Sequence, residues 1–147
     1  MLAATSELLL PPGTRTTPDG ETWRRGAAPG SGTGVFFHTL PPGAGGMGTL
    51  ALVNRAFGGG RGLGVQIRYS QASFPLLWQW RNLLNGEYVM GLEPTNAHGG
   101  GRHATREAGT LRVLAPGETE VFRSEITALG DLEEIEAAAG RIAGGIG

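Results

Sequence analysis

The sequence predicts a mainly β protein, an antiparallel β-sandwich with a short helix at its C-terminal end. Apolar residues alternate with polar or small ones in several short segments, which is typical of strands with one buried face. Glycine and proline, 27 and 9 of the 147 residues, gather between those segments, where they favour turns. A helical period replaces the alternation only after residue 130.

The alternating segments define the expected strands. In chain order they are Glu7 to Leu10, Val35 to Leu40, Thr49 to Val53, Leu63 to Tyr69, Leu76 to Arg81, Glu87 to Glu93, Leu111 to Leu114 and Glu120 to Ala128. Polar, proline-containing residues 12–34 are expected to form a long surface connection, and residues 94–109 a second polar loop. In the last strand, Phe122, Ile126 and Ala128 are expected to face the core.

Turn and capping signals divide the chain further. Asn85-Gly86 predicts a two-residue hairpin turn, and Pro116-Gly117 suits a type II turn. Asp131, with Glu134 three residues later, predicts a capped helix over residues 131–143. Its apolar stripe consists of Leu132, Ile135, Ala139 and Ile142. We therefore expect a sandwich over residues 1–129, followed by a helix and tail over residues 130–147 that pack on the sheet.

Composition excludes several functional classes. Twelve arginines, no lysine and a net charge of -1 leave no basic field for nucleic acid or a membrane surface. The absence of cysteine excludes disulfides, thiol catalysis and thiolate metal sites. No apolar run suits a signal peptide or a membrane span, so a cytoplasmic location is expected. His98 and His103 lack a third ligand at recognisable spacing, so no metal and no cofactor are expected.

Candidate functional residues concentrate between Trp78 and Arg102. Aromatic faces that cover the C–H side of a sugar, beside a few fixed polar groups, are typical of carbohydrate sites. Trp78 and Trp80 share one face of a predicted strand, and Arg81 lies on the other. Glu93, Asn96 and Arg102 are candidates to bind sugar hydroxyls. Two alternatives stay open: the tryptophans could belong to the core, and Glu93 could form a salt bridge with Arg81 or Arg102.

A family resemblance gives these residues a context. The run GEYVMGLEPTNAHGGGR, preceded by FPLLWQWRN and followed by LRVLAPGETEVFRSEI, resembles the carboxy-terminal half of aldose 1-epimerase-like proteins in the galactose mutarotase superfamily, closest to an uncharacterised bacterial branch. The similarity covers residue 7 to about residue 129. It implies a large antiparallel β-sandwich that binds a monosaccharide in an open cleft. It also implies that Glu93 is the general base, which takes the anomeric hydroxyl proton while an imidazole protonates the ring oxygen.

The same resemblance implies that the catalytic machinery is incomplete. The imidazole acids of such enzymes come from the amino-terminal half, and this chain is expected to begin after it. His38 is a candidate sugar contact, or else a hydrogen-bonded histidine at a sheet surface. Three hypotheses follow: an aldose 1-epimerase-like isomerase domain that uses Glu93, a non-enzymatic sugar-binding or regulatory module, and a half that completes its sandwich by self-association or with another chain.

Overall fold

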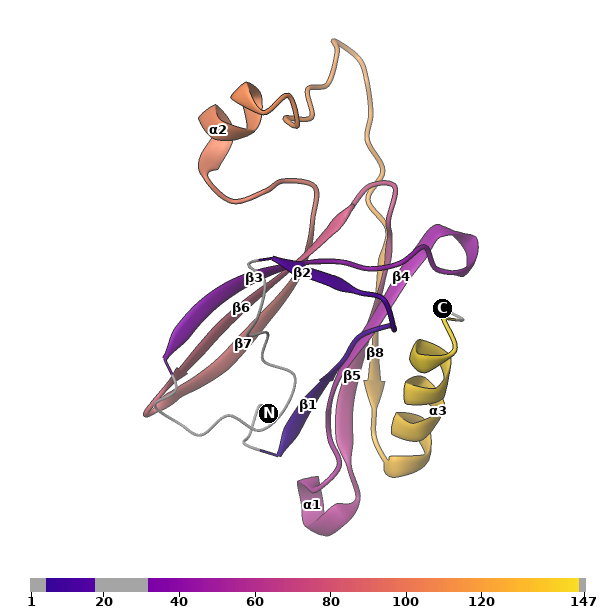
Figure 1. Ribbon diagram of the computed structural model, residues 1–147. Helices are drawn as coiled ribbons and strands as arrows, with labels where there is room; N and C mark the ends of the chain where they lie inside the picture. The colour runs from indigo at the N-terminus through magenta and orange to yellow at the C-terminus, as the bar shows by residue number, and fades with distance from the viewer. Residues whose placement is uncertain (1–4, 18–31, 146–147) are drawn as a thin grey trace.

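The computed structural model describes residues 5–17 and 32–145. Within these residues, two four-stranded antiparallel sheets pack face to face, and a C-terminal helix lies on the outside of one of them (Figure 1). The mainly β class predicted from the sequence is therefore confirmed, as is the short C-terminal helix.

Each sheet is built mostly from hairpins. The first has the order β1-β4-β5-β8, with β1 (Ser6–Leu9), β4 (Met47–Asn54), β5 (Leu63–Ser70) and β8 (Ser124–Leu129). The second has the order β2-β3-β6-β7, with β2 (Arg15–Thr17), β3 (Thr33–Thr39), β6 (Leu76–Leu84) and β7 (Glu87–Thr95). Short helical turns η1 (Ala44–Gly46) and α1 (Phe57–Gly60) lie in connections, and α2 (Gly101–Glu107) and α3 (Leu132–Ala143) follow later.

The hairpin of β6 and β7 positions the segment that carries the candidate residues. Leu84 pairs with Glu87, which leaves Asn85-Gly86 as the two-residue loop that the sequence predicts. Gly86 has a φ of 83°, in the left-handed region that glycine reaches without strain. Both strands are longer than expected, so Glu93 lies inside β7 and not at its end.

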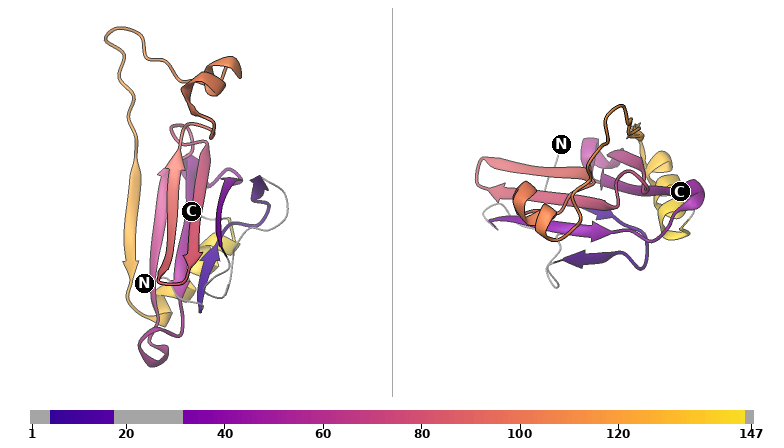
Figure 2. Two further views of the ribbon diagram at one scale, coloured as in Figure 1. Left: turned by 90° about the vertical axis from the view of Figure 1, so that its left-hand side faces the viewer. Right: turned by 90° about the horizontal axis from the view of Figure 1, so that it is seen from above.

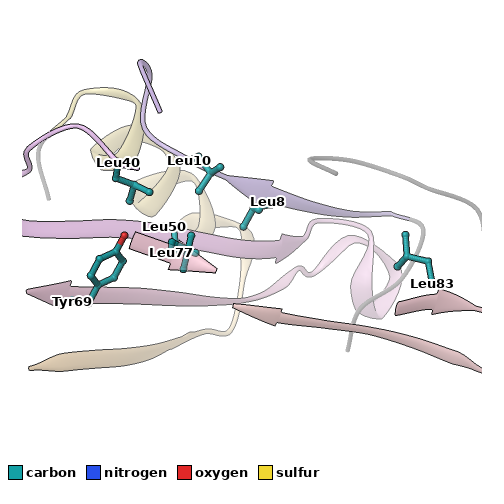
Figure 3. Close-up of a cluster of buried hydrophobic side chains, with 7 residues drawn as sticks. All are labelled: Leu8, Leu10, Leu40, Leu50, Tyr69, Leu77 and Leu83. Atoms are coloured by element: carbon teal, nitrogen blue, oxygen red, sulfur yellow. The ribbon is translucent and has the colours of Figure 1, made fainter. Parts of the chain in front are cut away.

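The core lies between the two sheets and follows from the alternation. It contains Leu8, Leu10, Leu40, Leu50, Tyr69, Leu77 and Leu83, contributed by both sheets and adjoining residues (Figure 3). Because side chains alternate along β6, Leu77 and Leu83 point into this core while Trp78 and Trp80 point to the outer face. Burial raises the pKa of the Tyr69 phenol above its ordinary value.

Helix α3 covers the outer face of the first sheet. Asp131 caps it by accepting a hydrogen bond from the Glu134 backbone N–H at 2.9 Å, as the sequence predicts. Its buried side chains, Ile135, Ala138 and Ile142, pack against Ala51, Val53 and Leu129. The first sheet is therefore buried on both faces over part of its width.

Several expected elements are wrong or incomplete. The connection predicted over residues 12–34 contains β2, which adds a strand to the edge of β3; residues 18–31 lie outside the described residues. The loop predicted over 94–109 contains α2. The sequence did not predict this helix because three glycines stand before its helix-favouring residues. Residues 111–114 form no strand. Among the described residues, no helix has the length and apolar character needed to cross a bilayer.

The last predicted strand is shorter and more exposed than expected. It begins at Ser124. Phe122, Ile126 and Ala128 were expected to face the core, but all three are exposed, Phe122 to 48% and Ile126 to 74%. Ile126 does point to the inner side of the first sheet, opposite Ile67, but the second sheet does not extend over it. Alternation therefore identified the side of the strand correctly and its burial wrongly.

Candidate functional site

The outer face of the second sheet brings Glu93 and the tryptophans together. Residues opposite each other in an antiparallel sheet share a face, and Phe37, Trp78 and Glu93 form one such row across β3, β6 and β7. The adjacent row on this face contains Trp80 and Gly91. A carboxylate therefore lies within a surface of aromatic side chains, from segments as far apart in the sequence as β3 and β7.

Glu93 is exposed and its carboxylate lies beside Gly91. A Cβ added at Gly91 would be 2.6 Å from Oε1 of Glu93 and 3.5 Å from Cε3 of Trp80. The missing side chain at position 91 thus leaves room for the carboxylate to approach the Trp80 indole. Within the described residues Glu93 forms no ion pair with Arg81 or Arg102, so the salt-bridge alternative is wrong. The carboxylate remains open to a ligand.

The two tryptophans have different environments. Trp80 is 38% exposed and presents part of its ring to solvent. Trp78 is half-buried, its ring centre lies 5.1 Å from that of Phe37, and its Nε1 is buried without a hydrogen-bond partner. Trp80 is therefore the more accessible of the two rings, whereas Trp78 packs against Phe37.

Phe37 and His98 belong to this face although the sequence did not single them out for it. The His98 ring centre lies 6.0 Å from that of Phe37, and a Cβ on Gly99 would be 3.1 Å from Cζ of Phe37. The residues after β7 therefore fold back over Phe37. One signal was available, since Phe37 alternates with His38 and so had to lie on the opposite face of β3.

His38 lies on the inner face of the sheet and is fully buried. Its Nδ1 is 2.9 Å from the Thr16 hydroxyl, and its Nε2 is 2.9 Å from Oε1 of Gln79. The Gln79 amide nitrogen is directed to the Met90 sulfur, so its oxygen accepts from a proton on His38 Nε2. His38 is thus part of a core hydrogen-bond network and is on the opposite side of the sheet from Glu93.

The other candidate residues are also spread out. Arg81 lies on the same face as His38, with its guanidinium 5.0 Å from the centre of the Phe36 ring and its Nε buried without a hydrogen-bond partner. Asn96 lines an open hollow of about 340 Å³, together with residues that include Arg112 and Glu120. Arg102 is exposed at the start of α2. The structure therefore joins Glu93 to Trp78 and Trp80, and separates it from His38 and Arg81.

The two sheets and the C-terminal helix define the class of fold, an aldose 1-epimerase-like β-sandwich. A crystal structure from Klebsiella pneumoniae subsp. pneumoniae, described as that of a "putative aldose 1-epimerase", matches with a TM-score of 0.82 at 23% sequence identity. The match covers 99% of this chain and 40% of that one, so the chain spans less than half the length of the Klebsiella protein.

A family model also matches most of the chain. The model of the family described as "Domain of unknown function (DUF4432)" matches residues 2–128, and the chain belongs to that family. No match was found among curated proteins.

Proposed function

We propose that this chain binds a monosaccharide, or a related small carbohydrate, on the outer face of the second sheet, with Glu93 as the general base for anomer interconversion. The observation that carries the proposal is an exposed carboxylate, free of ion pairs within the described residues, beside the accessible ring of Trp80. An indole covers the C–H face of a pyranose while a carboxylate accepts from its hydroxyl groups.

The chemistry that this arrangement supports is proton abstraction. A carboxylate that accepts the anomeric hydroxyl proton starts ring opening, and an acid that protonates the ring oxygen completes it. His38 is buried behind the sheet, whereas His98 and Trp78 both contact Phe37 on Glu93's side. We therefore assign His98 as the imidazole that faces the sugar and protonates its ring oxygen. Asn96 and Arg102, in the segment after β7, remain candidate contacts to further hydroxyl groups.

Binding without turnover is the second candidate. It is favoured by the position of His38, which lies on the other side of the sheet from Glu93 and is held by Thr16 and Gln79. In that case the sugar face is a recognition surface, and any acid needed for catalysis comes from elsewhere, such as a histidine-bearing half on another chain. A cytoplasmic location belongs to both versions of the proposal.

The decisive experiment compares Glu93→Gln with Glu87→Gln. Glu87 lies on the same strand and the same face but bonds to the Asn82 amide at 2.9 Å, so it is a matched control. We expect tryptophan fluorescence to report sugar binding and NMR to report mutarotation in the wild type. Glu93→Gln should lower the catalysed rate by about 10²–10⁴ and Glu87→Gln should not.

The outcomes separate the two versions. Binding that is retained while mutarotation of every aldose equals the buffer rate would support the non-enzymatic module. No binding and no turnover across common monosaccharides would refute both. A His98→Ala variant that keeps the full rate would remove that imidazole from the mechanism.

A further inference from the structure

Within residues 5–17 and 32–145, strand β8 leaves one edge of the first sheet unpaired. It is the terminal strand of the first sheet, and every residue from Ser124 to Ala128 is exposed, with only Leu129 buried (Figures 1 and 2). Exposed edges of this kind attract other strands, and proteins usually protect them with charges, proline or a covering segment. The middle of this strand carries a single charged residue, Glu125, which is paired with Arg68, and beside it Ile126 is 74% exposed.

The register with β5 shows which backbone groups of β8 are free. Ser70 donates its N–H to the Arg123 carbonyl at 3.0 Å, so Arg123 belongs to a hydrogen-bonded pair of the ladder. In an antiparallel ladder such pairs alternate with pairs whose N–H and C=O groups point away. The groups of Ser124, Ile126 and Ala128 therefore point outward, where the described residues provide no strand to receive them.

We propose that a second copy of this chain covers this edge by antiparallel pairing of β8 with β8. A two-fold axis at Ile126 places Ile126 opposite its own copy and Ser124 opposite Ala128 of the second copy. All three outward-pointing residues then form hydrogen-bonded pairs, and no other two-fold register of this strand uses all three. The two four-stranded sheets would join into one continuous sheet.

Side-chain chemistry agrees with this register. Glu125, already paired with Arg68 at 2.7 Å, would lie opposite Thr127 of the second copy, so no like charges face each other. Phe122 would lie opposite Gly130 of the second copy, which has no side chain to clash with its ring. Phe122 is 48% exposed, and its ring centre is 5.0 Å from that of Phe74, which packs against the core.

A second copy is the occupant that these observations favour because the edge is self-complementary. The proposed dimer uses the edge of the first sheet, whereas the proposed sugar site lies on the outer face of the second sheet. The two proposals are therefore tested independently of each other.

Three variants of adjacent residues test the pairing. Ile126→Lys places two lysines opposite each other at the two-fold axis and should leave the protein monomeric. Thr127→Lys adds the same charge one residue later, but opposite Glu125 of the second copy, and should keep the dimer. Thr127→Glu creates two like-charge pairs with Glu125 and should raise the dimer Kd about tenfold.

Sedimentation equilibrium from about 1 to about 100 µM would measure these constants, with circular dichroism to verify that each variant is folded. Hydrogen exchange gives a second readout, since the amides of Ser124, Ile126 and Ala128 should be protected in the wild type and exchange freely in Ile126→Lys. A wild type that stays monomeric over this range would overturn the proposal. So would a dimer that tolerates both Ile126→Lys and Thr127→Glu.

Discussion

Truncation of Leu83 and of its neighbour Leu84 tests the assignment of the two faces of β6. Leu83 is fully buried between the sheets, whereas Leu84 is 42% exposed on the outer face. Replacing Leu83 by alanine removes three buried carbon atoms and leaves a cavity, which costs about 3 to 4 kcal/mol of unfolding free energy. Leu84 already has much of its side chain in water, so its truncation should cost about 1 kcal/mol or less.

Thermal unfolding converts these costs into a measurable difference. An unfolding entropy of about 2.1 cal/mol/K per residue gives about 0.3 kcal/mol/K for 147 residues. Leu83→Ala should therefore lower Tm by about 10 °C, and Leu84→Ala by about 3 °C or less, in far-UV circular dichroism at dilute protein. A one-residue shift of the strand would exchange the faces. Equal losses, or a larger loss for Leu84→Ala, would refute the arrangement.

Two further predictions concern Gly91 and Tyr69. In Gly91→Ala the added Cβ would meet Oε1 of Glu93 at 2.6 Å, so the flexible carboxylate must move; Tm should stay constant or rise slightly, while Glu93-dependent mutarotation should fall by about 10²-fold. Full activity in this variant would count against the site. Burial raises the pKa of Tyr69, so above about pH 10, where only the unfolded phenol ionises, the free energy of unfolding should fall by about 1.4 kcal/mol per pH unit. Urea titrations between about pH 9 and about pH 11 should show a shallower fall in Tyr69→Phe, and an identical slope would contradict that assignment.

Much of the fold could be predicted from local patterns. Alternation along Val35 to Leu40 separates Phe36 and His38 from Phe37, and in β3 they do lie on opposite faces of the sheet. Asn85-Gly86 and Asp131 identified a turn and a helix start, because both depend on the backbone preferences of a few adjacent residues. The same local reasoning missed α2, where glycines precede the helical residues.

The candidate site could be predicted only in part. Glu93, Trp78 and Trp80 were identified from residue type and alternation, but their contact depends on the pairing register of β6 with β7. Phe37 and His98 were not connected with them, since that contact joins residues far apart in the chain. His38 was a reasonable sugar contact by sequence and proved to be a buried residue on the opposite face.

The sequence by itself determined the period of each strand, the turns between them and the capped helix, because these follow from steric preferences within a few residues. Only the tertiary structure decided which face of each strand is covered, as Ile126 and Gln79 illustrate. Alternation divides side chains between two faces, but a side chain is buried only where the opposing sheet or a helix extends over it. The same limit applies to Glu93, whose aromatic surroundings come from strand pairing and not from its sequence neighbours.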